Sequence, residues 1–183
     1  REIIDTYLHN PEDNTTEAIH NLLKESVESA SARIHERGIM NPEQRGMGTT
    51  LTALLLVGQR GFIAQVGDSR VYRIRGDEIE QLTGDHSLYN AMLQSGAQLD
   101  NEAALGRLKN AVTRAVGASP ELEVDTFELD LLASDRFVLC SDGLSGYLDG
   151  AELLAVAREP DCDTAVEQLI MGANERGGRD NIT

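Results

Sequence analysis

Residues 49–82 read TTLTALLLVGQRGFIAQVGDSRVYRIRGDEIEQL, and no other stretch of the chain constrains the fold as strongly. Four segments within it are rich in aliphatic, aromatic and β-branched residues, and short Gly-containing connections separate them. Strands joined by such short connections pair antiparallel, because parallel neighbours need a long crossover. We therefore predict antiparallel strands at Thr49–Val57, Phe62–Val66, Val71–Ile74 and Glu78–Leu82.

Helical patterns flank this stretch in the sequence. Asn14 and Glu17 match a capping box, and apolar residues then recur at helical spacing. We predict a helix over Thr15–His35, then a polar loop over Glu36–Arg45 that contains Gly and Pro. A less regular helical region is expected over Ser87–Asn110.

The C-terminal part continues the alternation of strands and helices. Strands are predicted at Phe127–Leu131 and Phe137–Cys140, and two helices follow, at the capping-box patterns that begin at Asp149 and Thr164. An antiparallel sheet and amphipathic helices bury their apolar faces together only in layers. The order of elements therefore predicts a layered α+β domain.

The length and the two ends of the chain lead to further expectations. A chain of 183 residues is long enough for one domain with a core, so we predict a single, partial domain over residues 1–183. The first residues show neither an initiator Met nor a signal-peptide pattern, and the last ones stop where a β-favouring run begins. We expect both ends to be cuts, with the sheet continuing past Thr183.

Composition narrows the classes of partner. The formal net charge of −15 argues against nucleic acid and against anionic lipid, because both attract Lys and Arg. No apolar run is long enough to span a membrane. Cys140 and Cys162 show no CxxC spacing, which favours a reduced, cytoplasmic protein. We expect a monomer that binds no nucleic acid and does not insert into a membrane.

Candidate functional residues are carboxylates at strand ends. The GxxxxGK[ST], GxGxxG, HExxH and GxSxG motifs are absent from the sequence. Mg²⁺ and Mn²⁺ prefer oxygen ligands and keep several waters, so a few carboxylates on a rigid rim suffice to bind them. Taken singly, such residues are more often turn or cap residues, since Asp-Gly is a common turn dipeptide. The candidates are Asp68, Asp85, Asp142 and Asp180.

Six blocks of sequence give these carboxylates a shared context. They are GMGTTLTA at residues 46–53, VGDSRVY at 66–72, LTGDHS at 82–87, TRAVG at 113–117, LCSDGL at 139–144 and RDNIT at 179–183. In order and spacing they closely resemble consecutive blocks of the protein phosphatase 2C family, in its compact bacterial branch. The resemblance spans Gly46 to Thr183.

The resemblance implies a fold and a metal centre. The fold is a layered α/β/β/α sandwich of two antiparallel sheets flanked by helices, here without the N-terminal strands and the last strand. The centre holds two ions of Mn²⁺ or Mg²⁺ through Asp142 and Asp180, and a third ion in bacterial members through Asp85 and Asp142. Asn181 resembles a partner that orients this catalytic site. Asp68 resembles a structural position, and the region Ser87–Asn110 resembles a flap that influences substrate access.

The same resemblance implies the reaction. A metal-activated water attacks a Ser or Thr phosphate monoester, without a covalent phosphoenzyme. The expected partners are phosphorylated proteins, either substrates of an opposing Ser/Thr kinase or the kinase itself.

Two blocks of the family do not occur in these 183 residues. One is an RxxNED-like block whose Arg grips the substrate phosphate, and the other is a DGMGG-like block whose Asp bridges both metals. We therefore expect this chain by itself to bind Mn²⁺ weakly and to show little or no phosphatase activity. Two other hypotheses stay open: a regulatory pseudophosphatase that binds partners without catalysis, and a phosphatase that acts on anti-sigma-factor antagonists.

Overall fold

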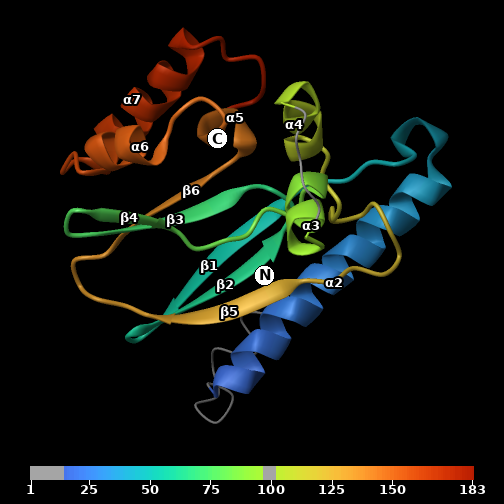
Figure 1. Cartoon of the computed structure of the whole chain (residues 1–183). Helices are drawn as coiled ribbons and strands as arrows, with labels where there is room; N and C mark the ends of the chain where they lie inside the picture. The colour runs from blue at the N-terminus through green and yellow to red at the C-terminus, as the bar shows by residue number, and fades with distance from the viewer. Residues whose placement is uncertain (1–14, 97–101) are drawn as a thin grey trace. The chain divides into compact units, whose positions relative to one another are not determined.

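The structure is a computed structural model that describes residues 15–96 and 102–183 (Figure 1). The chain divides into two compact units, each described here by itself. Unit 1 contains the segment up to Gly67 and the segment His86–Leu131, and unit 2 contains Asp68–Asp85 and Leu132–Thr183. Among the described residues, no helix combines the length and apolar character needed to cross a bilayer.

Unit 1 is built on a three-stranded antiparallel sheet. Its central strand β2 (Arg60–Val66) lies between β1 (Leu51–Val57) and β5 (Asp125–Asp130). From Gly61 to Val66 the central strand is buried, as expected for a strand covered on both faces. The remaining elements of the unit are α2 (Thr16–Met40), η2 (Pro42–Gln44), α3 (Leu88–Gln94) and α4 (Glu102–Lys109).

Helix α2 supplies the apolar stripe that covers this sheet. Its residues Ile19, Leu23 and Val27 are buried in one cluster with Phe62 and Val66 of β2. At its start, Arg60 donates from Nη1 to Thr16 Oγ1 at 2.7 Å, and its guanidinium lies 5.2 Å from the centre of the Phe62 ring. The stripe predicted from helical spacing is therefore the face that packs on the sheet.

The ends of α2 differ from the prediction. The N-cap is Thr15, whose Oγ1 accepts from the Ala18 N–H at 3.2 Å; Asn14 lies outside the described residues. At the other end, residues 36–40 continue the helix instead of forming a loop, because Glu and Arg are good helix formers. The helix stops at Asn41, immediately before Pro42.

Unit 2 is built on a second antiparallel sheet. Its central strand β3 (Arg70–Arg75) lies between β4 (Glu78–Gln81) and β6 (Arg136–Cys140). Three helices follow β6: α5 (Asp142–Ser145), α6 (Gly150–Ala157) and α7 (Cys162–Glu175). The core of the unit joins the strands to these helices through Tyr72, Cys140, Leu144, Leu148, Leu153, Leu169 and Ala173.

One of the two predicted C-terminal caps is confirmed and the other is wrong. Asp149 and Glu152 form a capping box at the start of α6, with hydrogen bonds of 2.9 and 3.0 Å. Helix α7 instead begins after Asp161, whose Oδ2 accepts from the Thr164 N–H at 2.9 Å. Thr164 fits the cap pattern by sequence, but the stronger acceptor lies three residues earlier and takes that role.

The two antiparallel sheets with their helices confirm the predicted α+β fold. The four strands predicted from residues 49–82 pair antiparallel as two hairpins in two sheets, because the chain leaves β2 in a conformation that only Gly adopts easily. Gly67 has φ +101°, and a Cβ there would come within 2.3 Å of the Thr50 side chain. The predicted helical region 87–110 contains α3 and α4, and residues 97–101 within it lie outside the described residues. The single domain over residues 1–183 stays a prediction.

An ion pair at the start of β6 yields a stability prediction for unit 2. Asp135, with a side chain only 1 % exposed, accepts from Arg75 Nε and Nη2 at 2.7 Å each. These hydrogen bonds lower the pKa of Asp135 from 3.8 to about 2. A carboxyl group whose pKa is lower in the folded than in the unfolded state stabilises the fold at every pH above its unfolded pKa. This stabilisation is lost as the pH falls through the folded pKa.

We therefore expect Asp135→Asn to lower the free energy of unfolding by about 1–2 kcal/mol at neutral pH, after allowance for solvent screening at the partly exposed Arg75. The difference should shrink between pH 4 and pH 2, the window between the two pKa values of Asp135. Urea unfolding across this range measures it. A difference that stays constant down to pH 2 would show that the charge of Asp135 is not its source.

Candidate metal centre

The SDG block (Ser141–Gly143, within LCSDGL) lies where β6 ends and α5 begins. Cys140, the last residue of β6, pairs with Arg70 of β3, so the sheet fixes the backbone immediately before the block. Asp142 is the first residue of α5 and is exposed, whereas Gly143 and Leu144 are buried. The strand therefore holds the backbone in place while the Asp142 carboxylate faces solvent.

The RDN block (Arg179–Asn181, within RDNIT) lies directly against the SDG block. Ser141 Oγ donates to the Asn181 carbonyl at 3.2 Å, and the backbones of Ser141 and Thr183 are joined by a hydrogen bond of 3.1 Å. The Thr183 N–H also donates to Ser141 Oγ at 3.2 Å. A Cβ on Gly143 would come within 2.3 Å of the Asn181 carbonyl oxygen, so the close approach requires Gly at this position. Asp142 and Asp180 are thus carried by two backbone segments that are bonded together.

Asp180 and the residue before it are positioned by short-range contacts. The Arg179 N–H donates to the Tyr147 hydroxyl at 3.1 Å, and Asp180 Oδ1 accepts from the Asn181 N–H at 2.8 Å. Asp180 is exposed. The second carboxylate oxygen of Asp180 and the carboxylate of Asp142 suit a hard cation. Such a cation needs only a few protein oxygens beside its waters.

Asp68 lies closer to these residues than the sequence reasoning assumed. It is 7 % exposed, and burial is the largest cause of its raised pKa, followed by the negative charge of Asp142 and, more weakly, that of Asp85. The negative charges of Asp142 and Asp85 therefore both act on Asp68. The structural role expected for Asp68 stays a prediction.

Asp85 is engaged by a cation of the protein itself. Arg70 donates from Nε to Oδ1 at 2.8 Å and from Nη2 to Oδ2 at 2.7 Å, which is a two-pronged ion pair. Gln81 Nε2 also donates to Oδ1 at 3.2 Å. Arg70 lies in the VGDSRVY block, but its pairing with Asp85 was not predicted from the sequence.

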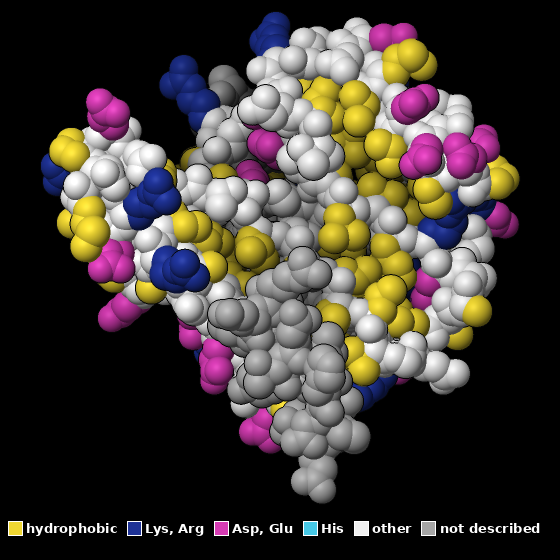
Figure 2. Space-filling view, turned by 180° about the vertical axis from the view of Figure 1, so that it is seen from behind, with side chains coloured by type: hydrophobic (Ala, Val, Ile, Leu, Met, Phe, Trp, Pro, Cys, Tyr) yellow, Lys and Arg dark blue, Asp and Glu magenta, His cyan; other side chains and the backbone are white. Residues whose placement is uncertain are grey.

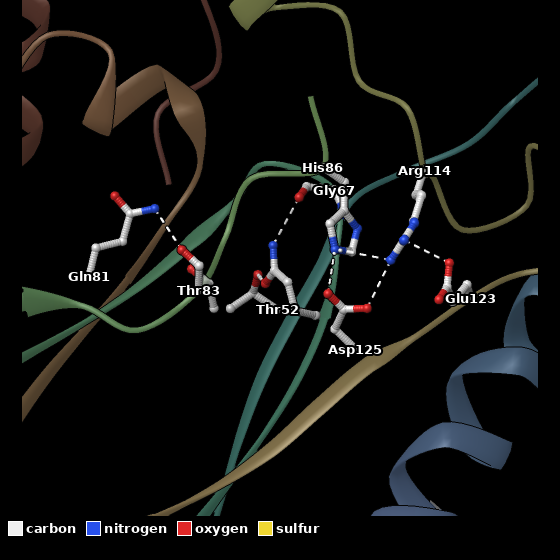
Figure 3. A network of polar contacts seen from close by, with 9 residues as sticks. Thr52, Gly67, Gln81, Thr83, His86, Arg114, Glu123 and Asp125 are labelled. Carbon is white, nitrogen blue, oxygen red and sulfur yellow. Dashed lines mark hydrogen bonds and ion pairs between the residues drawn. The ribbon is translucent and has the colours of Figure 1, made fainter. Parts of the chain in front are cut away.

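In unit 1, His86 is the centre of a network of polar contacts (Figure 3). His86, with a side chain 8 % exposed, accepts from the Gly67 N–H through Nδ1 at 3.2 Å. Its Nε2 therefore carries the proton and donates to Asp125 Oδ2 at 3.0 Å. Arg114 holds the other Asp125 oxygen at 2.8 Å and also pairs with Glu123. Asp68 follows Gly67, and Asp85 precedes His86, in the sequence.

Cys140 is unsuited to nucleophilic catalysis. Burial raises the pKa of its thiol to about 11, so the thiol stays protonated at neutral pH. This excludes the cysteine chemistry that its place next to the SDG block could otherwise offer.

The described residues supply a partial set of metal ligands. In the part of the chain that the structure describes, no three side chains of His, Cys, Asp or Glu are grouped to hold one ion. Asp142 and Asp180 fit a Mn²⁺ or Mg²⁺ site in donor type and in accessibility. Asp85 fits only if Arg70 gives up its hydrogen bonds to the Asp85 carboxylate. The fit is thus good for two of the three predicted ligands.

The comparisons with known proteins place this chain in one family. The family model described as Protein phosphatase 2C matches residues 1–182. The chain therefore belongs to the protein phosphatase 2C family, as its motif blocks predicted.

Two relatives show how much of the length is shared. The chain is 38 % identical to "Protein phosphatase PhpP" of Streptococcus pneumoniae over 159 residues, which are 86 % of this chain and 64 % of the relative. It is 35 % identical to "Serine/threonine phosphatase stp" of Listeria innocua over 170 residues, or 92 % of this chain and 68 % of the relative. The chain thus spans less than two thirds of the length of the pneumococcal protein.

Solved structures agree in fold. The serine/threonine phosphatase of S. agalactiae superimposes with a TM-score of 0.84 at 36 % identity, over 92 % of this chain and 69 % of that one. The catalytic domain of the serine/threonine protein phosphatase PstP, solved with two manganese ions, gives 0.80 at 30 % identity, over 98 % of this chain and 75 % of that one.

Proposed function

We propose that the protein of which these residues form part is a metal-dependent phosphatase of phosphorylated Ser and Thr residues. The observation that carries the proposal is the hydrogen bonding of Ser141 to Asn181 and Thr183, which joins the two backbone segments that carry Asp142 and Asp180. The oxygen-only donors suit Mn²⁺ or Mg²⁺, two ions as in PstP and a third at Asp85.

The residues of this chain have separable tasks in that reaction. Asp142 and Asp180 would hold the cations, and Ser141 keeps their two segments together. Bound cations of this kind lower the pKa of water and neutralise charge on phosphoryl oxygens. Asn181 contributes its backbone carbonyl to Ser141, which supports its proposed role as an orienting residue. Because the thiol of Cys140 stays protonated, the chain offers no cysteine nucleophile there, in line with direct attack by water.

The proposed partners are phosphoproteins, namely kinase substrates or the kinase itself. On the face shown in Figure 2, the described Lys and Arg side chains are scattered among carboxylates and uncharged groups. With a formal net charge of −15, this distribution supports a protein partner over nucleic acid. We also propose that the protein is a monomer and lies in the cytoplasm; the cytoplasmic location rests on the two free cysteines.

The test is phosphate release from a phosphothreonine peptide in the presence of Mn²⁺. The product of the complete reading frame that contains these residues should hydrolyse the peptide and lose this activity in EDTA. The 183-residue chain by itself should release little phosphate from the peptide or from p-nitrophenyl phosphate, because no bridging carboxylate block is present.

Two outcomes would contradict these expectations. Robust turnover by the 183-residue chain would show that the DGMGG-like block is dispensable. A complete protein that folds and binds partners but never releases phosphate would favour the pseudophosphatase hypothesis instead.

A further inference from the structure

The side chain of Asp85 is already neutralised by a cation of the chain. Both of its oxygens accept from one guanidinium, at 2.8 and 2.7 Å, and the two side chains are only 15 % and 26 % exposed. Water therefore screens this pair less than an exposed one. The contact is a planar, two-pronged fit that Arg makes and Lys cannot.

Arg70 is held in this orientation by the sheet. It begins β3, opposite Cys140 of β6, and its Nη1 donates to the Tyr72 hydroxyl at 2.9 Å. Residues 70 and 72 lie on the same face of the strand, since side chains alternate along it. The hydrogen bond to Asp85 is the largest cause of the raised pKa of Arg70, so the guanidinium is charged at every accessible pH. The cation is thus preorganised over Asp85.

The surroundings of the pair attract positive charge. The negative charges of Asp142 and Asp85 both act on Asp68, which is itself buried. A cation near them relieves this repulsion, whether it is a guanidinium or a metal ion. The same two Asp85 oxygens that Arg70 occupies are those that a metal would use.

We propose that Arg70 competes with a divalent cation for Asp85, and so sets the affinity of the metal position that Asp85 and Asp142 share. The proposal rests on the proposed metal-dependent function. A metal ion reaches Asp85 only when the guanidinium gives up one or both of its hydrogen bonds, and that cost weakens binding at this position. Arg70 is therefore a positioning residue that tunes the site, not a ligand.

The test is titration of the product of the complete reading frame with Mn²⁺ alone, with binding measured as loss of the free-ion EPR signal. Arg70→Met should bind Mn²⁺ about tenfold more tightly, because it removes the two hydrogen bonds from Arg70 to Asp85 and a nearby positive charge. Arg73→Met is the matched control: it removes the same charge from the opposite face of the same strand, where Arg73 pairs with the exposed Glu80. The control should bind Mn²⁺ as the unchanged chain does.

Two further variants keep the test decisive if Arg70→Met folds poorly. Arg70→Lys retains the charge but loses the two-pronged geometry, so it should show a smaller gain of about threefold. In Arg70→Met/Asp85→Asn the gain should vanish, because it acts through Asp85. Circular dichroism establishes that each variant is folded.

The outcomes separate this inference from the proposed function. Equal Mn²⁺ affinity in Arg70→Met, Arg70→Lys and the unchanged chain would overturn the competition, while the metal centre itself would stand. A gain that persists in the double variant, or that Arg73→Met reproduces, would likewise overturn it in favour of a general charge effect. If no variant binds Mn²⁺ at all, both the competition and the metal centre fail.

Discussion

Asp142→Asn, made in the product of the complete reading frame, is expected to lower Mn²⁺-dependent phosphatase activity by about a thousandfold while leaving the fold intact. Asp142 is exposed at the first position of α5, so its carboxylate supports no core packing. Its charge raises the pKa of the neighbouring Asp68, which means that it destabilises the fold locally. An exposed carboxylate that acts unfavourably on a second, buried carboxylate is best explained by what it binds.

Three measurements check this prediction. Phosphate release gives the loss of activity, EPR gives the loss of Mn²⁺ affinity, and carboxyl NMR should show the pKa of Asp68 falling toward its ordinary value when Asp142 is neutralised. The matched control is Asp163→Asn, which removes one charge from the exposed first turn of α7. If Asp163→Asn costs as much activity, the effect is one of net charge. If Asp142→Asn retains activity, Asp142 is not a metal ligand.

The two hairpins, β1–β2 and β3–β4, could be predicted because each depends on local signals. Residues 49–82 carry strand patterns with turns at Gly58 and Gly76, and both Gly residues have positive φ, as the turns require. The Asp149 capping box is equally local, since its partner lies three residues away. Where a short segment determines its own geometry, the pattern and the structure agree.

The rest depends on contacts that no short segment determines. The pair of Arg70 and Asp85 joins residues on either side of a hairpin, and neither residue has a sequence signature of pairing. The proximity of Asp68 to Asp142 is set by the pairing of β3 with β6, which are far apart in the sequence. The N-caps Thr15 and Asp161 were not predicted for a different reason. Several possible acceptors lie close together in the sequence at each helix start, and small differences in geometry select one of them.

The bond between the SDG and RDN segments offers the second large effect, through Gly143→Ala. The added Cβ would lie 2.3 Å from the Asn181 carbonyl oxygen and 3.0 Å from its carbonyl carbon. Both are backbone atoms, so no side chain can rotate away, and the RDN segment must move. We expect activity of the complete protein to fall about a hundredfold, since a displacement of about 1 Å near reacting groups has an effect of that size. The free energy of unfolding should fall by about 1–3 kcal/mol, as overpacking typically costs.

Gly150→Ala is the control for the same chemical change in unit 2, because a Cβ there meets only Ile79 at 3.6 Å, an ordinary contact. It should keep full activity, and Ala at the start of α6 should not destabilise the helix.

Ser141→Ala provides a second route to the same displacement without overpacking, since it removes the two side-chain hydrogen bonds to Asn181 and Thr183. Both groups can turn to solvent, so the loss in stability should be only about 1 kcal/mol. Mn²⁺ affinity should therefore be highest in Gly150→Ala, lower in Ser141→Ala and lowest in Gly143→Ala. Unchanged affinity in Gly143→Ala, with its fold intact, would mean that Asp180 binds no metal together with Asp142.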